Sequence, residues 1–411
     1  MRPDSPRLGL RALDPWARLA VVFWTAVLLV LAVRVAVKPN ARNLYPTWAT
    51  AGSDWLNGSD QLYRRTGERD NLIDTFRYTP FIASTLVPWH LLSERVGSVV
   101  WRFFNTGVFL GAVWWWLRAA APAALSQRRT AIFFLLLAPL ALTNLNNGQV
   151  NSLVIGFLVA ALAATAEERW WLSAVFVALA TALKLYPLAV GLLMVVCYPR
   201  KFAARLAVAL FAVAVLPFAL QRPDYVLAEY REWLSLLAID DRMYWPLHMA
   251  YRDLWLLFRV LHVPITPAAY QIVQIAGGGA CAVVCMLGRW RGQPVRQVLA
   301  TVLALGSCWM ILLGPATESA TYILLAPALA WSLVAERMGV AKVHVFAGSG
   351  LLLACLLAGL FRGAADFHGR GIHPLGALFF AAGSLIGALR RPEPQSQDAI
   401  QSAEKEPLLA A

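Results

Sequence analysis

Charged residues are scarce in this sequence. Asp, Glu, Lys and Arg together make up only 14% of its 411 residues, whereas an ordinary soluble domain carries roughly 25%. Hydrophobic residues make up 59% of the chain. The composition excludes a disordered chain, which would be polar and rich in charge, and it argues against a soluble globular enzyme.

Cysteines and the common catalytic motifs are scarce or missing as well. The five cysteines lie inside apolar runs, with neither a disulfide framework nor the spacing of a Cys/His metal site. The sequence contains no Walker loop, dinucleotide-binding glycine fingerprint, His-Glu-x-x-His helix or nucleophile-elbow serine. We therefore expect no cofactor, no tightly bound metal and no nucleotide donor held by a soluble domain.

Long apolar runs dominate instead, and a transmembrane helix needs about 20 predominantly apolar residues. The run 79–117 is interrupted by charges, and its first part, with Pro80 and Pro88, reads as a re-entrant or interfacial helix. If 79–117 counts as one crossing, we predict an all-α polytopic membrane protein with about twelve spans. The predicted spans are about 17–37, 79–117, 130–145, 149–166, 170–184, 187–198, 204–221, 268–288, 297–315, 319–335, 343–361 and 374–389.

The charges predict the orientation of these spans. Lys and Arg outnumber Asp and Glu by 36 to 23, for a net charge of +13. They form no basic stripe on a polar helix, so nucleic acid is not an expected partner. They fall in short segments on one side, which the positive-inside rule makes the cytoplasm. The segments contain Arg2, Arg7, Arg11 and Arg18; Arg118, Arg128 and Arg129; Arg200, Lys201 and Arg205; Arg289, Arg291 and Arg296; Arg337 and Lys342; and Arg390 and Arg391.

This orientation sets the predicted organisation. A cytoplasmic segment, 1–16, precedes a single transmembrane domain, 17–390, and a disordered cytoplasmic tail, 391–411, follows it. Both termini are then cytoplasmic, in the cytoplasmic (inner) membrane. The long loops 38–78 and 222–267 lie on the outer side with most acidic residues. Two long loops on one face predict a site at that outer, periplasmic face.

Two polar segments of the first outer loop are candidates for the site. In the first, Asp54 lies near the polar boundary of a predicted interfacial helix, for which a solvated surface helix is the alternative. In the second, Asp74, Arg77 and Tyr78 enter the bilayer together. The guanidinium of Arg77 suits a phosphate, and the alternative for it is snorkelling at the membrane interface.

Amides and a lysine follow on the same side. Asn147, Gln149 and Asn151 belong to a tight turn that leads into a span, where they suit a polyhydroxylated ligand or act as contacts between helices. Lys184 stands before Tyr186 and Pro187, between two apolar runs that are each too short for an upright span. The lysine is a point charge for a phosphate or a snorkelling residue.

A further acidic residue, Glu318, lies between two apolar spans on the outer face. It reads as a base, a ligand of the donor sugar or a loop carboxylate. The second outer loop adds eight polar and aromatic residues that the sequence does not rank. They are Asp240, Asp241, Arg242, Tyr244, Trp245, His248, Arg252 and Asp253.

Carboxylates, amides, aromatics and fixed cations at a bilayer boundary suit a lipid-phosphate donor. Its tail would stay in lipid while its phosphate reaches Arg77, Arg102 or Lys184. Its sugar, and the acceptor, would contact the amides and tyrosines: Tyr78, Asn147, Gln149, Asn151 and Tyr186.

Several motifs, in this order, resemble glycosyltransferase family 87 over roughly residues 40–200. They are Leu56-Asn57-Gly58, Leu62-Tyr63, Phe76-Arg77-Tyr78-Thr79-Pro80, Asn147-Gly148-Gln149-Val150-Asn151 and Lys184-Leu185-Tyr186-Pro187. The resemblance implies a C-type glycosyltransferase fold and an inverting transfer from a polyprenyl-phosphate sugar, often mannose or arabinofuranose. It also implies a glycan or glycolipid acceptor, with membrane lipids around the protein, and a catalytic carboxylate in the first outer loop.

The sequence departs from the family pattern in two places. Asn43 stands in the neighbourhood where members usually carry an aspartate, and the run from Gly314 to Tyr322 takes the place of a histidine-bearing motif. The catalytic carboxylate is therefore expected to be Asp54, Asp74 or Glu318. The alternatives to a transferase are a transporter or flippase of a lipid-linked or anionic substrate and a non-catalytic, glycan-binding membrane protein.

Overall fold

Helices make up the architecture of the protein. The computed structural model describes residues 14–39, 43–63, 75–239, 242–335, 341–358 and 369–390, and these ranges contain helices but no strand. The first half contains α1 (Pro15–Val37), α2 (Tyr45–Asn57), α3 (Pro80–Thr85), α4 (Val87–His90), α5 (Glu94–Ala119), α6 (Gln127–Asn147), α7 (Asn151–Ala166), α8 (Trp170–Leu183) and α9 (Leu188–Cys197). The second half contains α10 (Pro199–Val215), α11 (Pro217–Leu220), α12 (Pro223–Ile239), α13 (Leu254–Val260), α14 (Pro267–Trp290), α15 (Val295–Leu312), the 3₁₀ helix η3 (Ser319–Leu325), α16 (Ala326–Val334), α17 (Ala341–Ala358) and α19 (Ile372–Leu389).

Seven of the described helices are long and apolar enough to cross a membrane, namely α1, α5, α6, α10 with α11, α14, α15 and α19. Others are apolar but shorter, among them α7, α8 and α9. The prediction of an all-helical, multi-pass membrane protein is therefore confirmed, whereas the count of about twelve crossings is not. Short runs such as 170–184 form helices of less than bilayer length, because the chain breaks at Lys184.

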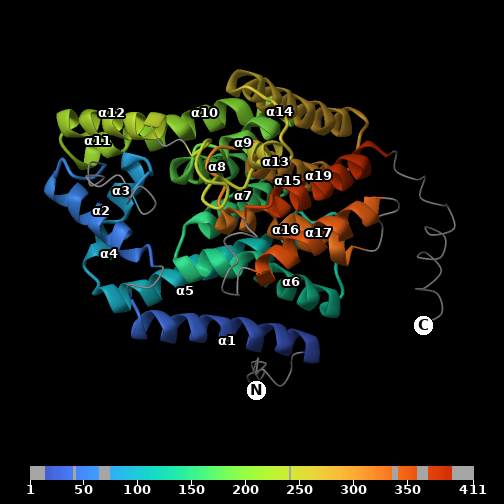
Figure 1. Ribbon diagram of the computed structural model, residues 1–411, viewed down its shortest axis with the longest axis horizontal. Helices are drawn as coiled ribbons and strands as arrows, with labels where there is room; N and C mark the ends of the chain where they lie inside the picture. Colours follow the sequence, from blue (N-terminus) through green and yellow to red (C-terminus); the bar gives the residue numbers. More distant parts are fainter. Residues whose placement is uncertain are drawn as a thin grey trace, which may run out of the picture.

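The centre of the bundle is α7, which packs against α5, α8 and η3. Nearly all of its residues are buried, and small side chains dominate its sequence. Such residues let neighbouring backbones approach closely, as membrane helices require. At Gly156, an added Cβ would lie 3.4 Å from the Cα of Phe109 on α5. Figure 1 shows α1 along one side of the bundle and α14 along the opposite side.

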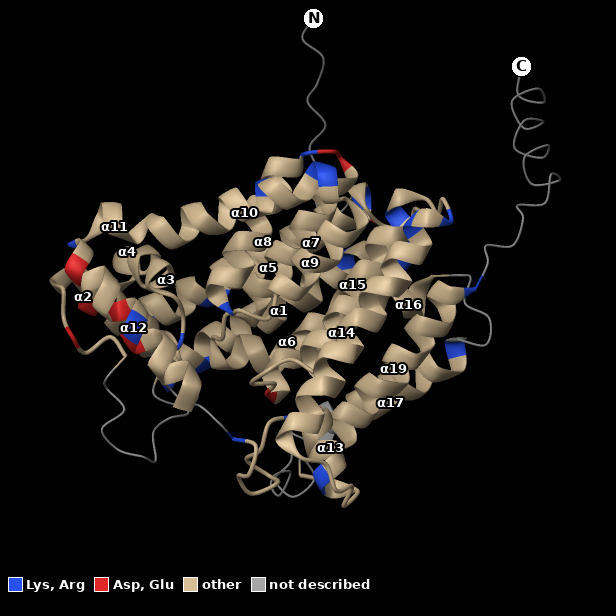
Figure 2. Cartoon of the chain, turned by 90° about the horizontal axis from the view of Figure 1, so that it is seen from above, with Lys and Arg blue, Asp and Glu red and all other residues tan. Residues whose placement is uncertain are grey.

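Short helices cover one end of this bundle. The predicted interfacial segment forms α2, which buries Trp48, Ala51 and Trp55 against its neighbours rather than lying free in solvent. It approaches α3 and α4 so closely that a Cβ on Gly52 would lie 2.4 Å from the Leu86 carbonyl oxygen. The second predicted loop, 222–267, is largely helical, because it forms α12 and α13. In Figures 1 and 2, α2, α11 and α12 gather at the same end of the molecule.

The two ends of the bundle differ in charge. Figure 2 shows acidic residues gathered around α2 and α12. The helix ends away from the short helices carry arginines and lysines, as at the starts of α6 and α10 and at the end of α14. The residues concerned are Arg128, Arg129, Arg200, Lys201, Arg289 and Arg291.

Candidate functional site

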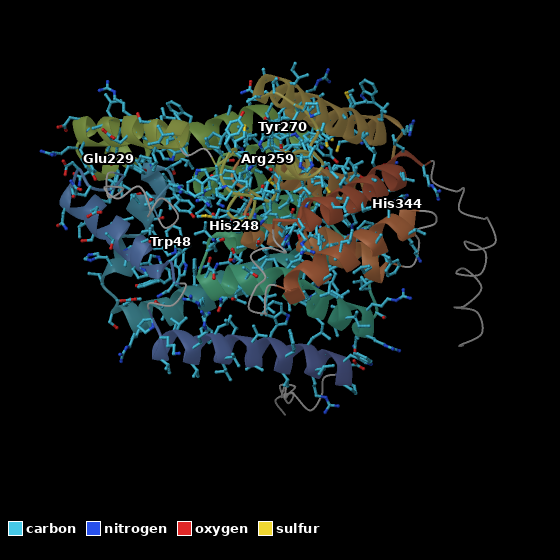
Figure 3. The ribbon with its side chains drawn as sticks, in the orientation of Figure 1. Trp48, Glu229, His248, Arg259, Tyr270 and His344 are labelled. Carbon is cyan, nitrogen blue, oxygen red and sulfur yellow. The ribbon has the colours of Figure 1, made fainter. Side chains whose placement is uncertain are left out.

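A cavity of about 600 Å³ lies at the acidic end, where helix termini from distant parts of the chain meet. It is lined by the end of α8, the turn before α7, the start of α14 and the segment after α15. The segment before α3 and the chain around α12 and α13 complete the wall. Trp48 on α2 and Tyr270 on α14, both labelled in Figure 3, contribute aromatic rings from two sides. One cavity thus collects side chains from positions between 44 and 318 of the sequence.

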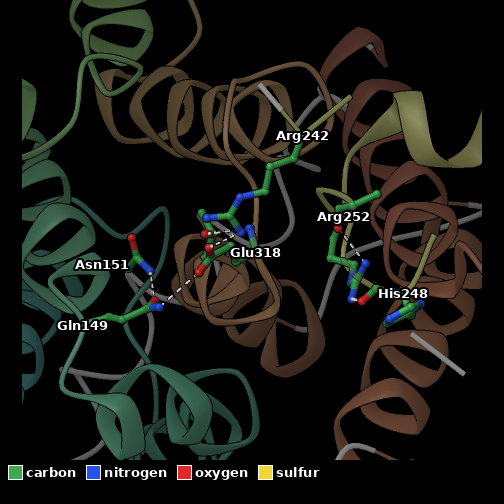
Figure 4. Close-up of polar contacts among 8 residues, drawn as sticks. Gln149, Asn151, Arg242, His248, Arg252 and Glu318 are labelled. Atoms are coloured by element: carbon green, nitrogen blue, oxygen red, sulfur yellow. Dashed lines mark hydrogen bonds and ion pairs between the residues drawn. The ribbon is translucent and has the colours of Figure 1, made fainter. Parts of the chain in front are cut away.

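Glu318 is held in this cavity by two partners. Its Oε1 lies 3.1 Å from Nη1 of Arg242, and its Oε2 accepts a hydrogen bond of 3.1 Å from Nε2 of Gln149 (Figure 4). It also caps η3, because its side chain accepts from the backbone N–H of Thr321 while its own N–H donates to the Thr321 hydroxyl. About a third of the Glu318 side chain remains exposed. The carboxylate is therefore fixed in direction and still open to a ligand.

The turn between α6 and α7 positions Gln149. Gly148 has a φ of +69°, in the left-handed region that favours glycine, and ends α6. Its carbonyl oxygen accepts hydrogen bonds from the indole N–H groups of Trp48 (3.1 Å) and Trp101 (2.9 Å). Asn151, fully buried at the start of α7, donates from Nδ2 to Oε1 of Gln149 at 2.9 Å. The amide of Gln149 therefore links the α7 terminus to the Glu318 carboxylate.

Three cations line the cavity around Glu318. Lys184 follows the last turn of α8 in extended conformation, and its Nζ lies 5.5 Å from the centre of the Tyr186 ring. No carboxylate in the described part of the chain lies within ion-pair distance of Lys184. Arg77 stands before α3, and its carbonyl oxygen accepts from the Trp233 indole at 3.0 Å. Arg242 lies between the rings of Trp245 and Tyr251, at 5.3 and 5.1 Å.

Burial raises the pKa of two groups that line the cavity, Asp253 and Tyr78. Burial raises the pKa of Asp253 to about 6, against hydrogen bonds from the backbone of Leu256 and others that lower it. Burial also raises the pKa of the Tyr78 hydroxyl, which therefore stays protonated and able to donate a hydrogen bond. The cavity thus offers donors and cations to an anionic ligand, and carboxylates to a ligand with hydroxyl groups.

Six of the residues expected from the sequence line this cavity. They are Arg77, Tyr78, Gln149, Lys184, Tyr186 and Glu318. Asn151 stands directly behind Gln149. Asp74 lies outside the described residues.

Asp54, Arg102 and Asn147 do not line the cavity. Asp54 is buried within α2, and its charge acts on Tyr225. Arg102 is almost fully buried in α5. Its guanidinium donates to Oδ1 of Asn43 (3.2 Å) and to the carbonyls of Ser98 (3.0 Å) and Asn146 (2.7 Å). The expectation that Arg102 meets a donor phosphate gains no support, because Arg102 does not line the cavity and both of its Nη atoms donate inside the fold.

Several lining residues were not identified from the sequence. Arg242 and Asp253 were seen in the second outer loop but not ranked, since a loop of that length gives no information on which side chains turn inward. Gln271 and Gln274 lie one helical turn apart on α14 and line the cavity together. Their spacing of three residues inside a predicted span was a usable signal, because polar residues within a span are costly unless they face a cavity.

No group of three or more His, Cys, Asp or Glu side chains among the described residues is arranged to hold a metal ion. The cavity offers carboxylates, cations, amides and aromatic rings. An apolar helical bundle with seven helices long enough to cross a membrane is typical of a multi-pass membrane protein, and this one has a polar cavity at one end.

The family model of glycosyltransferase family 87 matches residues 76–315. That range covers more than half of the chain, which belongs to this family and is accordingly a membrane glycosyltransferase. The matched range includes Arg77, Gln149, Lys184 and Arg242, and it ends just before Glu318. The resemblance recognised from the sequence motifs is confirmed.

Two curated relatives agree with this family. A polyprenol-phosphate-mannose-dependent alpha-(1-2)-phosphatidylinositol pentamannoside mannosyltransferase of Mycolicibacterium smegmatis (strain ATCC 700084 / mc(2)155) is 26% identical over 325 residues, 77% of this chain and 76% of the relative. A protein of the same name from Mycobacterium tuberculosis (strain CDC 1551 / Oshkosh) is 27% identical over 262 residues, 62% of this chain and 58% of the relative.

Proposed function

We propose that this protein transfers a sugar, with mannose as the first candidate, from a polyprenyl-phosphate donor to a hydroxyl group of a glycan or glycolipid acceptor. One observation carries the proposal. In a single cavity, the carboxylate of Glu318 is fixed by Arg242 and Gln149, and Lys184 and Arg77 line the same space. A group that accepts a proton and groups that stabilise a phosphate are the two requirements of such a transfer. The names of the two relatives support the donor and the sugar.

In the proposed reaction, Glu318 is the general base. It takes the proton of the acceptor hydroxyl while that oxygen forms a bond to the anomeric carbon of the sugar. The bond between the anomeric carbon and the phosphate oxygen breaks, and polyprenyl phosphate leaves with the bonding electron pair. A single displacement of this kind inverts the anomeric configuration. The contacts of Glu318 with Arg242 and Gln149 hold its carboxylate in one direction, which general base catalysis needs.

Lys184 and Arg77 are proposed to bind the donor phosphate and to stabilise the negative charge that it gains on leaving. Hydrogen bonds between such cations and an anion are stronger than neutral ones. The position of Lys184, without a carboxylate at ion-pair distance in the described structure, supports this role. Tyr78 and Gln149, with the rings of Trp48 and Trp233, are proposed to contact the sugar, because aromatic faces and amides are the groups that line sites for polar ligands.

We also propose that the cavity faces the outer side of the cytoplasmic membrane, with both termini in the cytoplasm. The helix ends opposite the cavity carry the arginines and lysines of α6, α10 and α14. The positive-inside rule assigns that side to the cytoplasm.

The direct test is transfer by the purified full-length protein in lipid, with radiolabelled polyprenyl-phosphate mannose and arabinofuranose as donors. We expect label to move to a glycolipid acceptor with inverted anomeric configuration. We expect Glu318→Gln to abolish the transfer in a folded protein. Donor binding without transfer by the wild-type protein, for every donor tried, would overturn the proposal in favour of a binding or transport role.

A further inference from the structure

Three consecutive residues before α3 are each held by a different part of the chain. The carbonyl oxygen of Arg77 accepts a hydrogen bond of 3.0 Å from the Trp233 indole of α12. The carbonyl oxygen of Tyr78 accepts one of 2.6 Å from the Tyr63 hydroxyl. The third residue, Thr79, bonds to α8. The backbone that carries the Arg77 side chain is therefore fixed at consecutive points.

Thr79 contacts α8 instead of capping its own helix. It occupies the N-cap position of α3, where a threonine hydroxyl commonly accepts a hydrogen bond from a backbone N–H of the first turn. The Thr79 hydroxyl makes no such bond within the described helix. Its Oγ1 donates to the carbonyl oxygen of Ala182 at 3.0 Å, and its backbone N–H donates to the same oxygen at 3.5 Å. Ala182 belongs to the last turn of α8, where carbonyls lack a partner within the helix.

This contact joins the backbones that carry two cations of the cavity. Arg77 stands two residues before Thr79. Lys184 stands two residues after Ala182, and the positive charge of Arg77 acts on it. The Glu318 carboxylate offsets part of this repulsion, since it also acts on Lys184. Two like charges held together favour an anionic ligand between them, because the ligand removes the rest of the repulsion.

We propose that Thr79 is a positioning residue that sets the separation of Arg77 and Lys184, so that both cations contact the same phosphate group. Thr79 is buried and does not line the cavity, so it acts through the two cations and not on the ligand itself. Two cations at a fixed separation bind one phosphate more strongly than two that move independently, because less freedom is lost on binding. The inference rests on the proposed function and adds to it the residue that couples the phosphate-binding cations.

The test compares Thr79→Val with Thr181→Val. Both threonines are buried, and both changes remove a hydroxyl while keeping a branched side chain. Thr181 precedes Ala182 on α8, but its Oγ1 donates within its own helix, to the Val177 carbonyl at 2.8 Å. Thr79→Ser keeps the hydroxyl and is the conservative variant. The measured quantity is the dissociation constant of polyprenyl phosphate for each purified full-length protein in lipid, with thermal unfolding recorded in parallel.

We expect Thr79→Val to raise this dissociation constant about fivefold, the value of one hydrogen bond of ordinary strength. Thr79→Ser should restore most of the affinity, and Thr181→Val should leave it unchanged. In a Lys184→Met background, Thr79→Val should change the dissociation constant by less than about twofold, because the separation of the two cations then no longer matters. A purely structural contact would weaken binding by the same factor in both backgrounds, and that result would overturn the proposal.

A second cycle does not depend on the folding of Thr79→Val. It combines Arg77→Gln with Lys184→Met and compares the fold-changes in the same dissociation constant. If both cations contact one phosphate, the double change should weaken binding by less than the product of the two single changes. Single effects that multiply without coupling would contradict a shared phosphate.

Turnover separates this inference from the proposed function. If the wild-type protein transfers sugar and Thr79→Val leaves kcat/KM for the donor unchanged, the positioning role is overturned and the proposed function stands. If the wild-type protein binds polyprenyl phosphate but transfers no sugar, an affinity loss in Thr79→Val that disappears with Lys184→Met supports the positioning role without the transferase. Equal weakening by Thr79→Val and Thr181→Val counts against the positioning role in either case.

Discussion

Replacing Glu318 by glutamine changes the charge of the site and little of its shape. The glutamine carbonyl oxygen can still accept the hydrogen bond that Gln149 donates to Oε2 in the wild-type protein, at 3.1 Å. It can also still cap η3. The amide nitrogen that replaces Oε1 then faces Nη1 of Arg242, which also donates, so the contact of 3.1 Å with Arg242 is lost. The variant is therefore expected to fold with the same cavity and without a proton acceptor.

Two magnitudes follow from these contacts. Loss of a general base lowers kcat by about 10²- to 10⁴-fold, which corresponds to roughly 3–5 kcal/mol of activation free energy. The expected loss in the free energy of unfolding is smaller than this change in activation free energy. Breaking a fully buried ion pair costs about 3–5 kcal/mol, but the Glu318 side chain is 33% exposed, so solvent screening should reduce the cost to roughly 1–2 kcal/mol.

The assay is the initial rate of sugar transfer at saturating donor, with thermal unfolding of each variant measured under the same lipid conditions. Asp54→Asn provides the comparison, because Asp54 was an equal candidate from the sequence and does not line the cavity. We expect its kcat to stay within a few-fold of the wild-type value. A Glu318→Gln variant that keeps more than about a tenth of the wild-type kcat lies outside the range for loss of a general base and would refute the assignment. So would loss of activity in a stable Asp54→Asn protein.

Three further predictions concern other charged residues. Lys184→Met should raise the KM for donor by roughly 10- to 100-fold, the value of a hydrogen bond to a charged group, and Lys184→Arg should recover part of the affinity in the same kinetic assay. Arg102→Gln should lower the unfolding temperature and leave the donor KM unchanged, because Arg102 bonds Asn43, Ser98 and Asn146 inside the fold; an altered KM in a stable variant would contradict this. For Asp253, the folded-state pKa of about 6 lies above its ordinary value of 3.8, so the folded protein binds the proton more tightly than the unfolded chain does. The ionised Asp253 carboxylate therefore destabilises the folded protein, and this destabilisation is fully present above pH 6. It is relieved as the pH falls towards 4, so Asp253→Asn should be more stable than the wild type at pH 7.5, by up to about 3 kcal/mol. In thermal unfolding curves, the difference in stability between Asp253→Asn and the wild type should vanish near pH 4. A difference that does not depend on pH would contradict the raised pKa of Asp253.

Much of the site could be predicted from the sequence where local rules apply. The break at Lys184 follows from two apolar runs that are too short to span and from Pro187, which lies between them. The turn at Gly148 follows from an Asn-Gly pair with amides on both sides. Both features appear in the structure at the predicted residues, because they depend on neighbours along the chain.

Partners that lie far apart in the sequence could not be predicted. Gln149 and Glu318 are 169 residues apart, and their hydrogen bond depends on how α7 and η3 pack. Arg242 contacts Glu318 across 76 residues, from a loop whose side chains showed no periodicity. The expected phosphate contact of Arg102 stays a prediction. In the structure its guanidinium donates to the Asn146 carbonyl, a partner 44 residues away that the sequence did not indicate.

The cavity residues lie far apart along the chain, so they are synthesised at different times. Synthesis and membrane insertion proceed from the N-terminus, so the cations at 77, 184 and 242 emerge well before the carboxylate at 318. Until η3 has inserted, the growing chain holds these cations at the membrane surface without the residue that Arg242 contacts. A ribosome-bound chain that ends after α14 therefore carries an incomplete site with excess positive charge.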